Sequence, residues 1–145
     1  MTSSPNRLIV PVLAPLYDRL TPFAWPLVRI VCGLLLVPFG WSKLTGPMFN
    51  NDVALFHRLG LEPAVALAWF ITILEFFGGM LLAAGFLTRI IALMIAVEML
   101  VITFAVAIPR GSGWQLTLLW ATCALALALV GGGRYSVDGA FKREF

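Results

Sequence analysis

Four long apolar stretches, separated by short polar segments, dominate the sequence. They cover about residues 21–42, 63–85, 88–108 and 114–130. A helix of roughly 20 residues crosses an ~30 Å hydrocarbon core, and each stretch is near that length. The pattern therefore predicts an all-α membrane protein, with four transmembrane helices packed as one bundle in a single domain, residues 1–145.

The polar segments between these stretches predict how the helices are connected. Only residues 86–87 separate the second stretch from the third, which indicates a tight antiparallel hairpin. The longer linker, residues 43–61, contains a segment at 50–59 that predicts a short surface helix between the first two spans. Residues 8–20 are interrupted by prolines and are too short to span, so we expect them at the membrane surface.

Composition favours a lipid environment. Of the 145 residues, 61% are hydrophobic and only 12% are charged, and the mean hydropathy is +0.97. A soluble domain of this length needs more polar surface to cover its core. The basic residues behind the net charge of +3 are scattered, so no nucleic-acid partner is predicted. The first six residues are polar and Arg7 is the only early cation, so we expect no cleavable signal peptide.

The distribution of cations predicts the orientation. An even number of spans puts both termini on one side, and the positive-inside rule makes the more basic side cytoplasmic. With Arg29 counted as within the membrane, the side of the termini carries Arg7, Arg19, Arg89, Arg134, Lys142 and Arg143, and the other side carries Lys43, Arg58 and Arg110. We therefore expect a multi-pass protein of the inner membrane, in contact with lipid, with both termini in the cytoplasm.

Three ionisable residues lie inside the predicted spans: Arg29, Glu75 and Glu98. An ionised group at the bilayer centre costs at least ~2.5 kcal/mol, so such residues normally face the bundle interior and have a partner. Each glutamate lies about 11 residues from the hairpin turn, roughly 17 Å along its helix. The two carboxyls are therefore expected at the same depth, and in a low dielectric they cannot comfortably both ionise. Arg29 is the expected counter-charge, although its long side chain could also reach back toward the interface.

Two interpretations of this cluster stay open. It could be a network that only fixes the register of the helices, or a site that handles a proton, an ion or a redox ligand. Small residues at helical spacing indicate that these helix faces point inward in either case. Gly33 and Gly40 follow Arg29, and Gly78 and Gly79 follow Glu75, and such residues allow helices to approach closely.

Weaker candidates lie outside this cluster. Cys32 and Cys123 fall at similar depth on the first and fourth spans, where a free cysteine usually packs as a small apolar residue. His57 is expected in the interfacial linker, with a role as proton carrier as the alternative. One histidine and two isolated cysteines cannot build a zinc, haem-attachment or iron–sulfur site, so no metal site is predicted.

Three motifs follow one another along the chain. They are Arg29-x-x-x-Gly33 with Gly40-x-x-Lys43-Leu44, then Glu75-x-x-Gly78-Gly79 with Gly85-x-x-Thr88-Arg89, and finally Gly131-x-Gly133-Arg134-Tyr135-Ser136-Val137-Asp138. In this order and spacing they resemble the DoxX family of small bacterial four-span membrane proteins, and the resemblance covers about residues 28–141. Lys43, within the first motif, is a fourth candidate for the buried polar site. Family members often carry a glutamate at the start of the last span, where this chain has Gln115, which can form hydrogen bonds but cannot carry a proton.

The resemblance implies an association with terminal quinol oxidase, with thiosulfate:quinone oxidoreductase, and with membrane-bound thiol and oxidative-stress systems. It favours an accessory subunit of a quinone-linked redox system, acting in thiosulfate or thiol oxidation or in a respiratory chain. In that role Glu75 or Glu98 would carry a proton. The cofactor would be a quinone, and a redox partner protein would supply electrons, because the chain shows no cofactor-binding motif.

Whether this chain is itself a subunit of an oxidoreductase stays open, and no residue is assigned as catalytic. One alternative is a non-catalytic membrane scaffold or assembly factor. The other is a small proton-coupled transporter, which at this length would act as a homo-oligomer.

Overall fold

The computed structural model describes residues 11–141, and within them the chain is helical, without strands. The helical elements in chain order are η2 (Pro11–Leu13, a 3-10 turn), α1 (Ala14–Thr45), α2 (Met48–Arg58), α3 (Ala64–Ile73), η3 (Leu74–Gly78, a π-helical turn), α4 (Gly79–Ala84), α5 (Thr88–Ile102), η4 (Thr103–Ala107, also π-helical), α6 (Trp114–Val130) and α7 (Val137–Ala140). The expectation of no signal peptide, and the cations Arg7, Lys142 and Arg143, lie outside the described residues.

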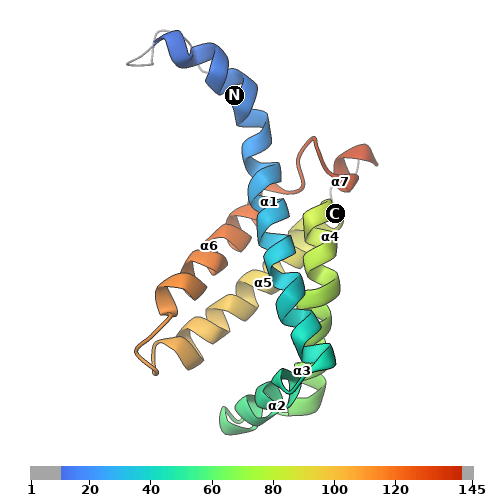
Figure 1. Ribbon diagram of the computed structural model, residues 1–145, viewed down its shortest axis with the longest axis vertical. Helices are drawn as coiled ribbons and strands as arrows, with labels where there is room; N and C mark the ends of the chain where they lie inside the picture. Colours follow the sequence, from blue (N-terminus) through green and yellow to red (C-terminus); the bar gives the residue numbers. More distant parts are fainter. Residues whose placement is uncertain (1–10, 142–145) are drawn as a thin grey trace.

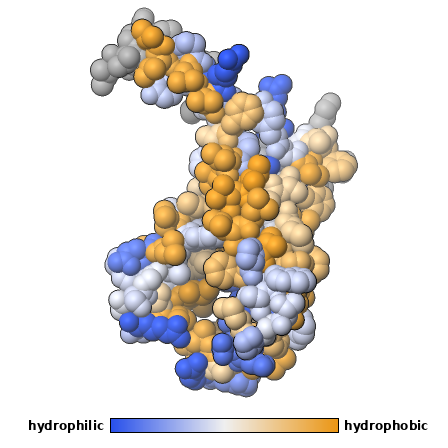
Figure 2. Space-filling model, in the orientation of Figure 1, coloured by the Kyte–Doolittle hydropathy of each residue, from blue (hydrophilic) through white to orange (hydrophobic). Residues whose placement is uncertain are grey.

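Three helical stretches are long and apolar enough to cross a membrane: Ala14–Thr45, Ala64–Ala84 and Thr88–Ala107. α6 is a shorter apolar helix of 17 residues. Figure 2 shows apolar side chains over the middle of the molecule and polar side chains gathered toward its ends. The prediction of an all-helical membrane protein is therefore confirmed, and the short helix predicted at 50–59 is present as α2, at Met48–Arg58.

The helices pack as two pairs around one apolar core. α1 lies against the stretch from α3 to α4, and α5 lies along α6. The pairs diverge from the turn that joins α4 to α5, so the hairpin is tight at residues 86–87 and opens toward α2 (Figure 1). Fully buried leucine and isoleucine side chains fill the core: Leu36, Leu82, Ile95 and Leu127. The N-terminal part of α1 lies at the opposite end of the molecule from α2, and α7 lies at the end of the helix bundle away from α2 (Figure 1).

α1 begins earlier than hydropathy predicted. It is continuous from Ala14, so the interruption expected before Thr21 is absent. Pro15 lies in the first turn, where the missing N–H costs nothing because the first N–H groups of a helix have no intrahelical acceptor. With 32 residues, α1 is about 48 Å long, which exceeds an ~30 Å hydrocarbon core. Its N-terminal part extends beyond the bundle (Figure 1).

Glycines bring α1 to backbone contact with its partner. A Cβ atom on Gly33 would overlap the carbonyl oxygen of Gly79, and one on Gly40 would overlap the backbone nitrogen of Phe76. The close approach expected from the small residues is therefore present. Because Gly40 lies one turn before Lys43, this contact also fixes the direction in which Lys43 leaves α1.

Candidate functional site

The structure brings Glu75 and Glu98 together. Glu75 lies in the π-helical turn η3 and Glu98 lies on α5, and their carboxyl groups are close enough to interact electrostatically. Both residues are buried, with exposed fractions of 5% and 6%. A π-helical turn interrupts the regular hydrogen-bond ladder of a helix and is frequent at functional sites. Glu75 is therefore presented to the interior by a local irregularity of its helix.

Lys43 is the cation that faces this pair. Its Nζ lies 2.6 Å from Oε2 of Glu75 and 2.8 Å from Oδ2 of Asp52 on α2. Lys43 is 8% exposed, so its ammonium group is held between two carboxylates with little access to water. Such a buried pair is stable only because each charge has a close partner. Lys43 is therefore not a loop cation, contrary to its place in the orientation count.

The prediction that Arg29 is the counter-charge of the two glutamates is wrong. Its guanidinium group donates hydrogen bonds to the carbonyl oxygens of Gly132 (2.5 Å) and Tyr135 (2.8 Å). Lys43 lies about four turns, roughly 21 Å, further along α1, beyond the reach of the Arg29 side chain. The segment after α6 leaves carbonyl groups without helical partners, and the planar guanidinium fork suits two of them. Arg29 therefore ties α1 to the C-terminal segment.

Asp138 belongs to this second polar cluster. Its Oδ1 accepts a hydrogen bond from the backbone N–H of Leu87 (2.9 Å), and its Oδ2 accepts from the N–H (3.0 Å) and hydroxyl (2.9 Å) of Thr88. A carboxylate at this position satisfies free N–H groups at the start of α5 and interacts favourably with the helix dipole. Asp138 also faces the charge of Arg29. Residues 131–138 thus close the end of the bundle at which α1, α6 and the α4–α5 turn meet.

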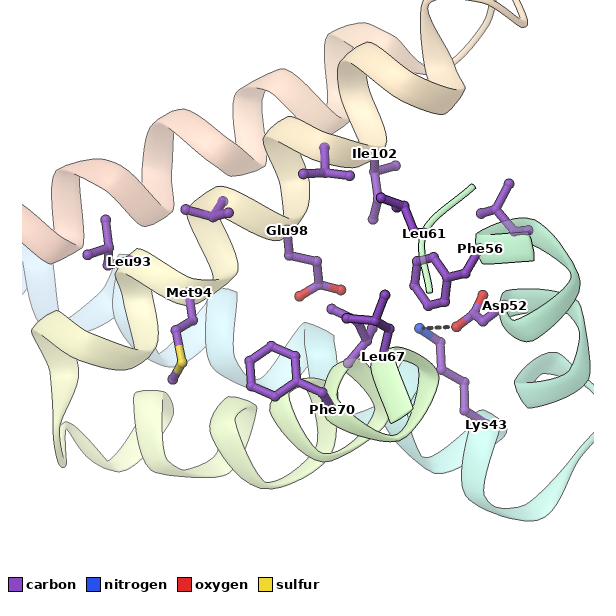
Figure 3. Close-up of a pocket in the computed structure, with 14 residues that line it drawn as sticks. Lys43, Asp52, Phe56, Leu61, Leu67, Phe70, Leu93, Met94, Glu98 and Ile102 are labelled. Atoms are coloured by element: carbon purple, nitrogen blue, oxygen red, sulfur yellow. Dashed lines mark ion pairs between the residues drawn. The ribbon is translucent and has the colours of Figure 1, made fainter. Parts of the chain in front are cut away.

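Two apolar clefts lie on either side of the Lys43–Glu75–Glu98 cluster. The Glu98 cleft has a volume of about 460 Å³, and apart from Lys43, Asp52 and Glu98 its lining residues are apolar (Figure 3). The Glu75 cleft, of about 530 Å³, is lined by residues of α1, α5, η3 and α6. Phe70 and Val97 at the Glu98 cleft are half-exposed on the apolar outer surface, so this cleft opens laterally, where lipid would lie.

Glu98 is the unusual side chain of the Glu98 cleft. Neither of its carboxyl oxygens has a hydrogen-bond partner among residues 11–141, and the carboxyl points from α5 into the space facing α3 (Figure 3). Burying a carboxyl group without a hydrogen bond is unfavourable. A group kept in this state suits ligand binding or proton exchange better than helix packing alone.

Sequence reasoning missed Asp52 and Asp138. An acidic residue on a predicted surface helix ordinarily faces water, and the signal that could have singled out Asp52 is the apolar run at 53–56 directly after it. Asp138 stands within the third motif, but nothing local to the sequence relates it to the start of α5. Both residues act across the fold, on helices that are distant in the sequence.

The weaker candidates lie outside both ionic clusters. Cys32 on α1 and Cys123 on α6 lie near each other, and neither residue lines the Glu98 cleft or the Glu75 cleft. Gln115 is exposed at the start of α6. His57 is exposed in the last turn of α2, where its Nδ1 contacts Glu62. None of the four therefore belongs to the buried polar site.

The contacts of Glu62 predict a pH-dependent contribution to stability. The backbone N–H of Ala64 and then His57 hydrogen-bond its carboxylate and lower its pKa. A lowered folded-state pKa stabilises the fold above the ordinary glutamate pKa of about 4.3, and this stabilisation is lost as the pH falls through the lowered value. Wild type should therefore be more stable than Glu62→Gln at neutral pH, and this difference should shrink as the pH falls below about 5, as measured by thermal unfolding in detergent. A difference between the two that is constant with pH would contradict the expectation.

Comparisons with known proteins agree with this architecture. The DoxX family model matches residues 24–108, a range that includes Arg29, Lys43, Glu75 and Glu98. Inner membrane protein YqjF of Escherichia coli (strain K12) is 28% identical over 122 residues, which cover 81% of this chain and 91% of that protein. No solved structure matches the chain.

Proposed function

The chain belongs to the DoxX family, and from that premise we propose that it is an accessory subunit of a quinone-linked redox system. It is a multi-pass protein of the inner membrane. In the proposed role, the Glu98 cleft receives the head group of a quinone from the bilayer. The single observation that carries the proposal is the buried, unpartnered carboxyl of Glu98 in an apolar cleft that opens toward lipid.

The residues of the Glu98 cleft fit a quinone in shape and chemistry. Its volume of about 460 Å³ lies within the usual range for small-molecule sites, which are mostly apolar with a few placed polar groups. Phe56 and Phe70 offer aromatic walls for a flat ring, and Glu98 offers a hydrogen-bonding group. A bound quinone would supply the redox chemistry, since its reduction takes up two electrons and two protons.

The chain's own groups account for binding and protons but not for electrons. Glu98 would hydrogen-bond the head group, and Glu75 would hold or pass a proton at its Oε atoms. Lys43 limits the negative charge of the pair, because its ammonium group contacts Glu75 directly. The electron donor would be a partner oxidoreductase, acting in thiosulfate or thiol oxidation or in a respiratory chain.

The membrane topology that accompanies this proposal has four spans and cytoplasmic termini, within a single domain. α6 has 17 residues, at the lower limit for a span. Because Lys43 is buried and paired, the predicted outer side retains only Arg58 and Arg110 as loop cations within the described residues. On the proposed cytoplasmic side the described cations are Arg19, Arg89 and Arg134, so within the described residues the bias is three cations to two, in the direction of the proposed orientation.

Replacing Glu98 by leucine tests the site. We expect the variant to bind a short-chain ubiquinone analogue about tenfold more weakly than wild type, because one hydrogen bond to a charged or polar group is lost. The same variant should be more stable, by about 1–3 kcal/mol, because a buried carboxyl without a partner is removed. Binding is measured by calorimetry on protein purified in detergent, and stability by thermal unfolding of the same sample.

Glu62→Gln is the matched control, because it removes a carboxylate outside the cleft and should leave binding unchanged. Equal binding by Glu98→Leu and wild type, or no binding by wild type, would exclude a quinone site in the Glu98 cleft. The non-catalytic membrane scaffold would then be the remaining function. Proton flux across vesicles in the absence of quinone would instead favour the proton-coupled transporter. Analysis of lipophilic compounds and proteins that co-purify from native membrane would identify the ligand and partner.

A further inference from the structure

Four ionisable side chains from four different elements form a continuous row. Asp52 of α2 contacts Lys43 of α1 at 2.8 Å, and Lys43 contacts Glu75 of η3 at 2.6 Å. Glu98 of α5 lines the same cleft as Lys43 and Asp52, and its carboxyl is close enough to that of Glu75 to interact electrostatically. The other residues that line the Glu98 cleft are apolar, so no further titratable group of the described chain faces it.

The row runs from the surface of the protein to its interior. The side chain of Asp52 is 23% exposed, and α2 is not among the helices that could span the membrane. Lys43, Glu75 and Glu98 are each less than 9% exposed. Asp52 is therefore the member of the row with the best access to water, and Glu98 lies at the apolar end.

The charges of the row indicate that it holds a proton. One ammonium group faces three carboxyl groups, and in a low-dielectric interior one cation does not balance three anions. Among the described residues, Glu98 is the member of the row that forms neither a hydrogen bond nor a salt bridge. A proton that resides on Glu98 or Glu75 needs a route to water, and the apolar walls of the cleft offer none.

We propose that Asp52 is the port through which Glu98 exchanges protons with the aqueous phase at the α2 end of the molecule. The steps are transfers of one proton each, without redox change. Asp52 first takes a proton from the aqueous phase. Lys43 then passes a proton from Nζ to Oε2 of Glu75 and regains one from Asp52, which returns to its carboxylate form, and Glu75 passes its proton to the ionised carboxyl of Glu98. The net change is one proton moved from the aqueous phase to Glu98, and release follows the same steps in reverse. The α2 end lies opposite to the N-terminal part of α1 (Figure 1).

The proton route rests on the proposed function in one respect only, which is that the proton would be used in the reduction of a bound quinone. A closed ionic network that merely holds α2 against the bundle would keep the same distances but would not exchange protons faster than the protein opens. The two possibilities therefore differ in the rate at which the buried carboxyl exchanges with solvent, and this rate can be measured without quinone.

The experiment follows the C=O stretch of the protonated carboxyl by infrared spectroscopy, in wild-type protein reconstituted into vesicles and transferred to D₂O. Loss of the band in Glu98→Gln assigns it. We expect Asp52→Asn to retain the band but to exchange at least about tenfold more slowly, equivalent to about 1.4 kcal/mol in the barrier. Asp52→Glu should restore the rate, and Asp18→Asn, an exposed acid at the other end of α1, should leave it unchanged.

A second measurement uses wild type alone, so a folding defect of Asp52→Asn does not decide the question. In vesicles with one orientation, a pH change on the α2 side should alter the band, and a change on the opposite side should not. Three results would each overturn the inference. They are proton exchange in Asp52→Asn at the wild-type rate, a change of the band when the pH is changed on the side opposite to α2, and the absence of a band assigned to Glu98. Failure of quinone binding with normal exchange would overturn only the proposed function.

Discussion

Replacing Lys43 by methionine should lower the free energy of unfolding by about 3–5 kcal/mol, the usual loss when one partner of a buried ion pair is removed. Methionine keeps the apolar stem of the lysine, but Glu75 and Asp52 lose the ammonium group that lies 2.6 and 2.8 Å from them. Glu75 then stays buried beside Glu98 with no cation to offset its desolvation. Unfolding by SDS in mixed micelles, followed by circular dichroism, measures the change.

A second substitution separates this effect from lost packing. Lys43→Met combined with Glu75→Gln should recover most of the stability, because the uncompensated carboxylate is gone while the methionine remains. Arg58→Met, which removes an exposed cation from α2, is the control and should change stability by less than about 0.5 kcal/mol. The ion pair between Lys43 and Glu75 would be contradicted if Lys43→Met unfolded at the same SDS fraction as wild type. It would also be contradicted if the double variant were less stable than Lys43→Met alone.

The helical framework of the protein could be predicted from the sequence because hydropathy and helix geometry act locally. The apolar stretch at 114–130 coincides with α6, and the two-residue turn lies where it was expected. The proximity of Glu75 and Glu98 followed from the constant rise per residue, measured on both helices from one shared turn. Depth along neighbouring spans is thus accessible from sequence when the connection is short.

The partners of the charged residues could not be predicted in the same way. Lys43 lies at the end of a span, where a cation usually belongs to the interface. It turns inward because Gly40 seats α1 on η3 and because α2 folds Asp52 over it. The carbonyl group that Arg29 binds at Gly132 lies 103 residues away in the sequence. These contacts depend on tertiary packing, which residue spacing does not encode.

The motifs that identify the family therefore contribute to two polar clusters with different consequences. Arg29 donates hydrogen bonds to backbone carbonyl groups and Asp138 accepts hydrogen bonds from backbone N–H groups, and together they close one end of the bundle. Lys43, Glu75 and Glu98 lie between two clefts, and Glu98 has no hydrogen-bond partner in the described part of the chain. Substitutions in the first cluster should lower the stability of the fold. Replacing Glu98 by an apolar residue should instead raise stability and weaken ligand binding.

Replacing Arg29 by methionine should destabilise the protein by about 3–5 kcal/mol. The substitution removes two hydrogen bonds from a charged donor, each worth about 1.5–3 kcal/mol, and leaves Asp138 without the cation that faces it. The segment 131–141 loses its attachment to α1, so it should also become more sensitive to protease. SDS unfolding gives the first quantity, and limited proteolysis with mass spectrometry of the fragments gives the second.

Two further variants decide what Arg29 does. Arg29→Lys keeps the charge but not the planar fork, so it should recover only part of the stability, and Arg19→Met, an exposed cation on the same helix, should be nearly neutral. The effects of Arg29→Met and Glu75→Gln should add within about 0.5 kcal/mol, because the two side chains share no partner. A larger coupling would make Arg29 the counter-charge of the glutamates after all, and the assignment of that role to Lys43 would fail.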